Sequence, residues 1–295
     1  CEIKSSTPDA AKILLEAEQT CSMARQKGGN QLELNKPSSD AKKLRQDDSE
    51  WGPRIRSALT ENRMRLEHQP IGSLNNDIEG AYDTLVRMLD EDGNTILPSQ
   101  FMPVAERTGL SKSIDRWVIG ASTSFCKTNS ASIVFVPQSR DSLLDDSLPS
   151  WLCEQIEKSR INAKQICFEI TEDTVVKHLR QTTDLANKLI SLGFRFAVEH
   201  FGTSSDSSHV IKLVPMSYLK IDGSLMQGLN KNPDMQNKIK NLVTEARQKN
   251  IHTIAERVQD ANTMAVLWQL GISFIQGNYV QSREIVMESM VAQTM

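Results

Sequence analysis

Short apolar runs along the chain alternate with longer stretches whose apolar residues recur at helical spacing, which predicts a β, α, β, α order. Several of these runs end in a polar residue of a kind that binds metal or phosphate. In a parallel barrel the carboxyl ends of the strands meet at one rim, so these polar residues should converge there. The runs are residues 166–168 before Glu169, 194–198 before Glu199 and His200, 218–219 before Lys220 and Asp222, 251–255 before Glu256, and 272–275 before Gln276.

The chain divides near residue 50. Residues 10–25 predict a helix and residues 31–34 a short strand, whereas residues 35–50 are polar, mixed in charge and without apolar periodicity, which is typical of a linker or a solvated connecting helix. From Trp51 onward a core-forming pattern is continuous, and its strand count favours a closed barrel over an open doubly wound sheet. The further predicted elements are helices at 55–62, 98–106 and 113–125 and strands at 64–70, 82–89 and 132–136.

Length and charge limit the possible functions. A chain of 295 residues can hold one barrel domain and a fragment of another, and because it begins with Cys1 we interpret it as a piece of a longer protein. A net charge of -3 without a basic run gives no footprint for DNA, RNA or an anionic membrane. No apolar stretch approaches the roughly twenty residues of a membrane span, so we expect no membrane insertion and a cytoplasmic location.

Seven short motifs occur in an order that carries a family resemblance. They are HQPI (68–71), DTLVR (83–87), FEITE (168–172), VEHFGTSSDSS (198–208), YLKIDGS (218–224), IAERVQ (254–259) and QGNYVQ (276–281). Together they resemble the EAL domain family. The resemblance implies an α/β fold, a TIM-like (β/α)8 barrel, and a site for cyclic di-GMP, which active members linearise with divalent metal.

The resemblance also implies a division of the chain. Residues 14–34 resemble the closing helix and strand of a GGDEF domain, so a short helix and strand would remain from an upstream domain. We expect residues 1–36 to be the C-terminal fragment of a GGDEF-like domain, residues 37–51 a linker or connecting helix, and residues 52–290 a degenerate EAL domain.

Departures from the family pattern fall on the positions that hold metal. Asp83 and Thr84 stand where active members have glutamate and alanine, Pro137 stands where a strand ends in a ligating asparagine, and Glu199 and His200 replace two aspartates. Magnesium tolerates little misplacement of its oxygen ligands, and a two-metal hydrolase needs both ions. We therefore expect no catalytic residue, no metal and no cofactor, with a residual polar network at Asp83, Glu169, Glu199, His200 and Lys220.

Other positions match residues that contact the nucleotide in the family. Arg87 can donate to a phosphate through its forked guanidinium, Glu256 can accept from guanine, and Leu85 and Phe201 can offer apolar faces to bases. Taken alone, Arg87, Asp115 and Glu256 could equally be structural ion pairs. The expected ligand-binding residues are Gln69, Leu85, Arg87, Asp115, Phe201, Glu256 and Gln276.

These features predict a catalytically inactive receptor that binds cyclic di-GMP without metal and signals through a protein contact. The chain looks most like the FimX-type regulators of type IV pilus function, whose EAL domain engages a PilZ-domain protein. Two alternatives remain open. One is a weak metal-dependent phosphodiesterase that uses Asp83, Glu169, Glu199, Lys220 and Glu256. The other is a protein-docking module without a ligand.

Overall fold

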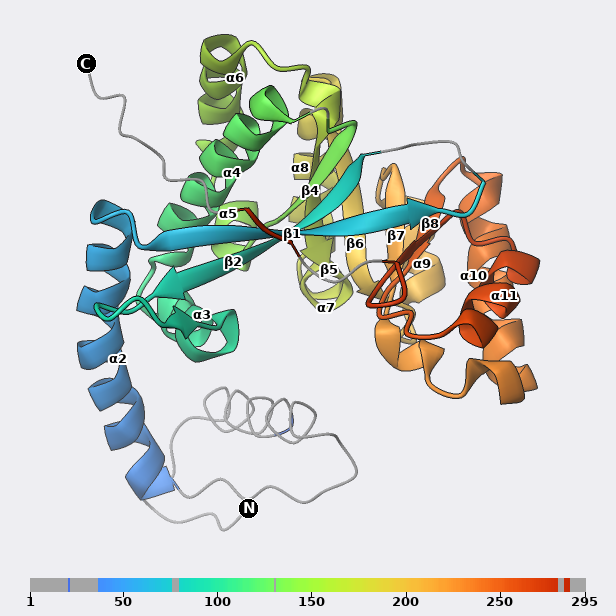
Figure 1. Cartoon of the computed structure of the whole chain (residues 1–295), viewed down its shortest axis with the longest axis horizontal. Coiled ribbons are helices and arrows are strands. Elements are labelled where there is room, and N and C mark those ends of the chain that lie inside the picture. The colour runs from blue at the N-terminus through green and yellow to red at the C-terminus, as the bar shows by residue number, and fades with distance from the viewer. Residues whose placement is uncertain (1–20, 22–36, 76–79, 130, 281–283, 287–295) are drawn as a thin grey trace. The chain divides into compact units, whose positions relative to one another are not determined.

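The computed structural model describes residue 21 and residues 37–75, 80–129, 131–280 and 284–286 (Figure 1). The chain separates into two compact units, Cys1–Pro53 and Arg54–Met295. Helix α2 (Pro37–Thr60) is continuous, so residues 37–51 and the helix expected at 55–62 belong to one element. The helix predicted at 10–25 lies outside the described residues except for Cys21, as does the strand predicted at 31–34. The GGDEF fragment and the domain boundaries therefore stay predictions.

Eight strands of the second unit close into a barrel, which confirms the predicted TIM-like fold. Their order around the barrel is β1-β9-β8-β7-β6-β5-β4-β2, and β2 pairs back onto β1. The strands from β4 to β9 are parallel, and β2 is parallel to β4. The strands are β1 (Met64–Ser73), β2 (Ala81–Leu89), β4 (Ile133–Pro137), β5 (Ile166–Thr171), β6 (Arg195–Phe201), β7 (Tyr218–Ile221), β8 (His252–Ala255) and β9 (Phe274–Gln276).

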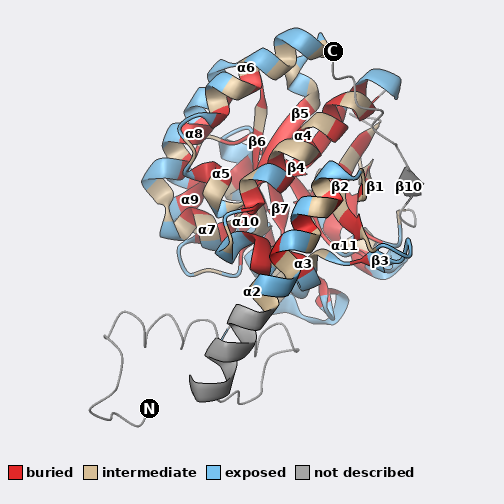
Figure 2. Cartoon of the chain, turned by 90° about the vertical axis from the view of Figure 1, so that its left-hand side faces the viewer, coloured by how far each residue is buried: buried red, intermediate tan, exposed pale blue. Residues whose placement is uncertain are grey.

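Helices connect the parallel strands and lie around the barrel, and Figure 2 shows buried residues in the strands and exposed residues on the outer sides of the helices. Two short strands extend the sheet, β3 (Thr95–Ile96) beside β2 and β10 (Glu284–Val286) beside β1. The helices are α3 (Pro98–Arg107), α4 (Ser111–Thr128), α5 (Arg140–Leu143), α6 (Leu148–Ser159), α7 (Glu172–Lys177), α8 (Leu179–Ser191), α9 (Ser207–Leu213), α10 (Pro233–Gln248) and α11 (Ala261–Leu270), with 3-10 turns at Ala163–Gln165, Gly223–Met226 and Leu229–Lys231.

One strand departs from the parallel arrangement that the sequence pattern predicts. β1 runs antiparallel to both of its neighbours, β2 and β9. Only residues 74–80 separate β1 from β2, and an antiparallel pair can be joined by so short a connection whereas a parallel pair needs a crossover. On β1 the polar Gln69 therefore lies toward the rim, and the later residue Ile71 reaches the barrel interior.

The barrel interior below the rim is a packed apolar layer rather than a pore. Phe135 and Tyr218 meet edge to face, with ring centroids 5.1 Å apart. Such layers of large side chains fill barrels of this size and fix the spacing of the strands. The layer consists of Ile71, Ala81, Ile133, Phe135, Cys167, Ala197, Tyr218, Ile254 and Phe274.

Beyond the rim, β1 and β2 continue as a two-stranded ribbon (Figure 1). The pairing of β2 with β4 ends at Asp83 and Phe135, but the pairing of β1 with β2 continues as far as Met64 and Met88. Side chains two residues apart lie on the same face of a strand. Leu85 and Arg87 therefore share the face of Asp83 and stand above the rim.

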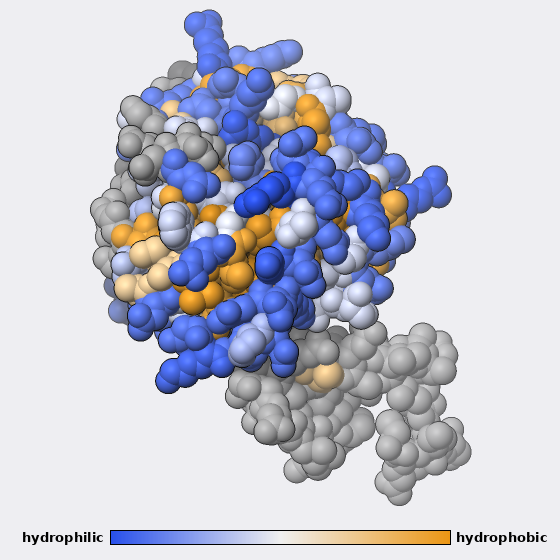
Figure 3. Space-filling view, turned by 90° about the vertical axis from the view of Figure 1, so that its right-hand side faces the viewer, coloured by the Kyte–Doolittle hydropathy of each residue, from blue (hydrophilic) through white to orange (hydrophobic). Residues whose placement is uncertain are grey.

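The face of the barrel that carries α10 and α11 is mixed in hydropathy. Figure 3 shows hydrophobic residues among hydrophilic ones on the face that carries α10 and α11. On α11, Leu267 is buried whereas the next residue, Trp268, is 61% exposed, so the helix packs against the barrel by one side only. Across the described residues, no helix combines the length and the apolar character that a membrane span requires.

The packed layer predicts a large loss of stability for Phe135→Ala. Phe135 is almost fully buried, so the cavity and the lost contacts should lower the free energy of unfolding by about 3–5 kcal/mol. Urea unfolding followed by circular dichroism measures this change. Leu97→Ala is the control, because Leu97 is 49% exposed and its truncation should change stability by less than about 0.5 kcal/mol. Equal effects of the two substitutions would contradict the description of the core.

Candidate functional site

The centre of the rim is a buried network around Lys220. Its Nζ lies 2.9 Å from Asp83 Oδ1 and 2.8 Å from Glu169 Oε2, so side chains from β2, β5 and β7 meet at one ammonium group. Gln276 Nε2 donates to Asp83 Oδ2 at 2.5 Å and to Gln69 Oε1 at 3.0 Å, which adds β9 and β1 to the network. The predicted convergence of Glu169, Lys220 and Gln276 is therefore present, and Asp83 and Gln69 join them.

Burial and charge oppose each other in this network. Burial lowers the pKa of Lys220, but the nearby carboxylates, first Asp83 and then Glu169, outweigh burial and hold this pKa well above its usual value. Burial raises the pKa of Glu169 well above its usual range, and the Asp83 charge adds to that effect while Lys220 opposes it. Lys220 thus stays an ammonium group that is shared between two carboxyl groups.

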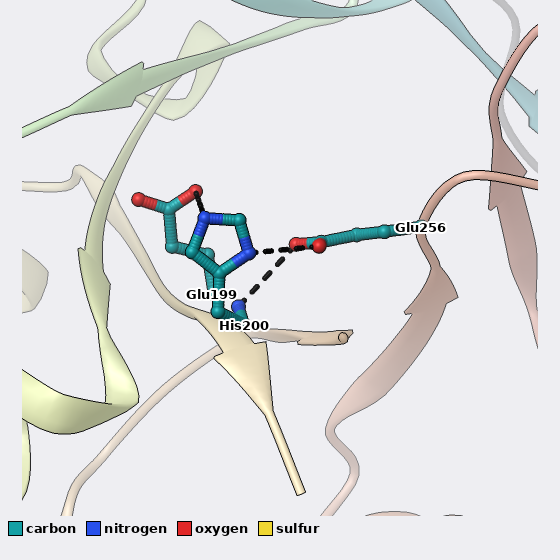
Figure 4. A group of neighbouring side chains, drawn as sticks. All are labelled: Glu199, His200 and Glu256. Atoms are coloured by element: carbon teal, nitrogen blue, oxygen red, sulfur yellow. Dashed lines mark hydrogen bonds and ion pairs between the residues drawn. The ribbon is translucent and has the colours of Figure 1, made fainter. Parts of the chain in front are cut away.

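A second group lies where β6 and β8 end, and Figure 4 shows its members facing one another. His200 Nδ1 lies 2.9 Å from Glu256 Oε2, and His200 Nε2 lies 3.8 Å from Glu199 Oε2. Asp222 Oδ2 approaches His200 Nδ1 at 3.4 Å. The ladder between β6 and β7 shifts register between Val198 and Phe201, and His200 has a φ of 52°. This bulge turns the imidazole toward Glu256.

The carboxylates around His200 favour its protonated form. Its hydrogen bond to Glu256, opposed by burial and assisted by the charges of Glu199, Glu256 and Asp222, raises the pKa of His200 to about 9. Burial raises the pKa of Glu199, although the charges of His200 and Lys220 partly offset this effect. His200 is therefore a cation at neutral pH, even though 44% of its side chain is exposed.

Arg87, on the ribbon above the rim, is already paired in the structure. Its Nη2 lies 2.6 Å from Glu67 Oε2, and its Nη1 donates to the carbonyl of Val86 at 2.8 Å. Glu67 belongs to β1 and lies two residues before Gln69, on the same face of the ribbon. The predicted phosphate-binding arginine thus has a partly buried carboxylate as its partner.

Glu172 holds the loop that follows β6. Its Oε2 accepts hydrogen bonds from the backbone N–H groups of Gly202, Thr203 and Ser204, each at 3.1 Å, and its Oε1 accepts from the hydroxyl of Ser207. Gly202 has a φ of 93°, and an added Cβ would lie 2.9 Å from Leu242 Cδ1, so glycine is required there. The loop between the bulge and α9 is therefore fixed by a carboxylate from the start of α7.

Three predicted ligand residues lie in other surroundings. Asp115 on α4 accepts from the backbone N–H and hydroxyl of Ser139 and from the hydroxyl of Ser142, so it holds the turn that begins α5. Burial raises the pKa of Asp115 to about 6 despite those bonds. Phe201 has no exposed surface, so a base could reach it only after neighbouring side chains move, whereas Leu85 is half-buried. Ligand contacts of these three residues stay predictions.

Comparison with known proteins supports the EAL resemblance. Residues 53–283 match the EAL domain family. The chain belongs to this family. The crystal structure of the FimX EAL domain from Pseudomonas aeruginosa bound to c-di-GMP is similar to this EAL domain, with a TM-score of 0.76 and 32% identity, over 81% of this chain and 98% of that chain.

Two curated relatives extend the comparison. Cyclic di-GMP phosphodiesterase PdeB of Shewanella oneidensis is 28% identical over 91% of this chain and 32% of its own length. Cyclic di-GMP phosphodiesterase PdeF of Escherichia coli is 31% identical over 76% of this chain and 30% of its own length. The chain thus spans about a third of the length of these relatives. Because both are named phosphodiesterases, they contradict the prediction that the chain is not an enzyme.

The metal that EAL domains imply can be tested against the donor atoms of the rim. Pro137 offers no side-chain donor, and Lys220 Nζ stands between Asp83 and Glu169, so this part of the rim does not fit a divalent ion in the described arrangement. Glu199, His200 and Glu256 each offer a ligand atom, and these atoms all lie within 4.8 Å of one another. The described residues thus fit one ion with nitrogen and oxygen donors, but not a pair of magnesium ions.

Sequence reasoning missed two contributors to the site. Glu67 is the partner of Arg87, and Glu172 fixes the loop after β6. Asp222, which the sequence places at the end of a strand beside Lys220, approaches His200 as a further member of the rim. Glu67 could have been found from the two-residue period that places it beside Gln69 on one strand face. No local pattern marks Glu172 as a loop holder, because its partners lie thirty or more residues away.

The opposite surroundings of two histidines predict opposite titration behaviour. His200 should stay protonated until the pH approaches about 9, whereas burial lowers the pKa of His68 to about 4. The stabilisation from His200 should be complete below about pH 6.5 and lost as the pH rises through about 9, because the folded-state pKa lies above the unfolded value. NMR titration of the histidine ring protons, assigned with His200→Gln and His68→Gln, measures both values. A midpoint near 6.5 for His200 would contradict the site geometry.

Proposed function

We propose that this EAL domain binds cyclic di-GMP on the barrel rim, beside the β1–β2 ribbon. The proposal rests above all on the 32% identity, over 81% of the chain, to an EAL domain whose crystal structure is bound to c-di-GMP. The described rim agrees with that ligand chemically. Arg87 offers a guanidinium group for a phosphate. Glu256 and Gln276 offer carboxylate and amide oxygens for guanine N–H groups, and Leu85 offers an apolar side chain for a base.

The rim side chains proposed to contact cyclic di-GMP have hydrogen-bonding capacity for the ligand. Glu256 accepts from the backbone and ring nitrogens of His200, and a carboxylate has further lone pairs that can accept from guanine. Gln276 Oε1 is buried without a hydrogen-bond partner among the described residues, so it can accept from a ligand N–H or from water. The Arg87 guanidinium can bind a phosphate through two parallel hydrogen bonds once it is released from Glu67.

We further propose that binding needs no added metal. Lys220 and His200 already place positive charge between the rim carboxylates, and Arg87 supplies the phosphate contact. A PilZ-domain partner and a role in type IV pilus function belong to the same proposal, since they follow from the resemblance to FimX-type regulators. We also propose a cytoplasmic location, as expected from the sequence. Gel filtration of the chain with a PilZ-domain protein, with and without cyclic di-GMP, tests the partner, and failure to co-elute in either condition would exclude it.

Metal-dependent hydrolysis of the bound nucleotide is a second candidate function. Two observations favour it: the relatives named as phosphodiesterases, and the convergent ligand atoms of Glu199, His200 and Glu256. Those three side chains would hold a single ion once His200 had released its ring proton, and the ion would supply an activated water. Hydrolysis adds that water across one phosphodiester bond and opens the ring to a linear dinucleotide. The Lys220 ammonium group would orient the phosphate by its charge, and Glu169, whose pKa burial raises, would exchange the proton.

Arg87→Ala should weaken binding of cyclic di-GMP by about 10- to 100-fold, because a charge-assisted contact to phosphate contributes about 1.5–3 kcal/mol. Isothermal titration calorimetry in excess EDTA measures the dissociation constant without metal. Arg180→Ala is the matched control, because Arg180 is an exposed arginine on α8 and its removal should leave affinity unchanged. Equal affinities of the Arg87 variant and the wild type would refute the phosphate contact.

The second candidate predicts which metal supports turnover. Imidazole is a better ligand for manganese or zinc than for magnesium, so the linear product should form faster with manganese than with magnesium. His200→Ala should reduce the manganese rate by at least about tenfold, since the site loses one of its three protein ligands. Chromatography of the nucleotides after incubation measures both rates. Absence of linear product with either metal would exclude this candidate while leaving the binding proposal intact.

A further inference from the structure

The ion pair between Arg87 and Glu67 stands out among the contacts of the ribbon. The two side chains are only 6% and 12% exposed, and their nearest charged atoms lie 2.6 Å apart. Their strands are directly paired, with Glu67 opposite Leu85 and Arg65 opposite Arg87. Both members of the pair are therefore held in place by the backbone and kept largely away from solvent, where a charge contact is strong.

The pair engages the Arg87 nitrogens that a phosphate would need. Nη2 is directed at Glu67, and Nη1 donates to the carbonyl of Val86. A phosphate binds a guanidinium best through two parallel hydrogen bonds. Both forks that a guanidinium can offer, Nη1 with Nη2 or Nε with Nη2, include the nitrogen that Glu67 engages, so Glu67 competes with the phosphate there. The phosphate must also approach a second negative charge.

A purely structural interpretation of Glu67 is the alternative. Arg65 and Arg87 are opposite each other on one face of the ribbon, and like charges at such positions repel. Arg65, however, donates to the carbonyls of Asn62 and Met64, at 2.7 and 2.8 Å. Its guanidinium is thus held by its own strand end, and only Arg87 pairs with Glu67 in the described structure.

We propose that Glu67 is a built-in competitor for Arg87. Its carboxylate holds the guanidinium in the ligand-free state, and a phosphate of the cyclic dinucleotide takes its place on binding. Glu67 therefore sets the affinity of the site by the stability of the pair that must be broken. This inference rests on the proposed binding of cyclic di-GMP and identifies a residue that tunes it.

Glu67→Gln tests the inference, because the amide keeps the size of the side chain and removes its charge. Titration calorimetry with cyclic di-GMP in excess EDTA should show affinity about tenfold tighter than that of the wild type. Glu91→Gln is the matched control, since Glu91 lies in the exposed turn after β2 and loses the same charge. Its affinity should stay at the wild-type value.

A double-mutant cycle separates competition from a general charge effect. In the Arg87→Ala background, Glu67→Gln should give no gain, because the competitor then has nothing to release. If Glu67 had only a structural role, Glu67→Gln would lower the thermal stability of the protein without tightening its binding of cyclic di-GMP. Unchanged or weaker binding of folded Glu67→Gln, or an equal gain in the Arg87→Ala background, would overturn the inference.

Two further comparisons keep the test decisive. If Glu67→Gln does not fold, Glu67→Asp keeps the charge but shortens its reach, and should give a smaller gain in affinity; no gain in this variant would overturn the inference. If the wild type binds and no Glu67 variant binds more tightly, the competitor role fails while the proposed function stands. If neither the wild type nor any variant binds cyclic di-GMP, the proposed function itself fails and the competitor role fails with it.

Discussion

The ammonium group of Lys220 joins the parts of the rim. It lies between Asp83 and Glu169, on three different strands of the barrel, and it is 1% exposed. Two carboxyl groups could not be buried so close together without a cation between them, because their mutual repulsion and their desolvation would both be unfavourable. Gln276 and Gln69 complete the hydrogen bonding of Asp83 and thereby tie β9 and β1 to the same centre.

Carboxyl groups elsewhere on the rim are also paired with a cationic side chain. His200 supplies positive charge to Glu199, Asp222 and Glu256, and Arg87 supplies it to Glu67. Carboxylates nevertheless outnumber cationic groups in these contacts, and burial raises the pKa of both Glu169 and Glu199. The excess of carboxyl groups suits this rim to bind a further cation. The cationic groups Lys220, His200 and Arg87 can at the same time bind an anionic ligand. Proton uptake and release should therefore accompany either kind of binding.

The sequence was a good guide to the elements that repeat and to the residues at strand ends. The barrel follows from apolar periodicity, and the convergence of Lys220, Glu169 and Gln276 follows from the rule that parallel strands end at one rim. Asp83 lies near the start of its strand, and only the family resemblance placed it at the site. The reversed direction of β1 depends on the length of one connection, which periodicity does not report. The partners of Asp115 and Arg87 depend on which neighbouring side chains are nearest in space, so residue type alone left structural and ligand-binding roles equally open.

The error about enzymatic function has a related origin. The prediction that the chain is not an enzyme rested on the loss of several metal ligands together, at Asp83, Pro137 and His200, whereas the chain is similar to relatives named as phosphodiesterases. The site geometry adds what single positions could not show. His200 and the two glutamates beside it, Glu199 and Glu256, form a set of one nitrogen and two oxygen donors. Histidine in place of an aspartate therefore alters the metal preference of the site instead of only removing one ligand.

Crystals of the chain with cyclic di-GMP and manganese, measured at the manganese absorption edge, test the account most directly. The account predicts the nucleotide on the rim with a phosphate at Arg87, Lys220 still between Asp83 and Glu169, and any anomalous peak confined to Glu199, His200 and Glu256. A nucleotide bound away from the rim, or two metal peaks with Lys220 displaced from its carboxylates, would contradict it.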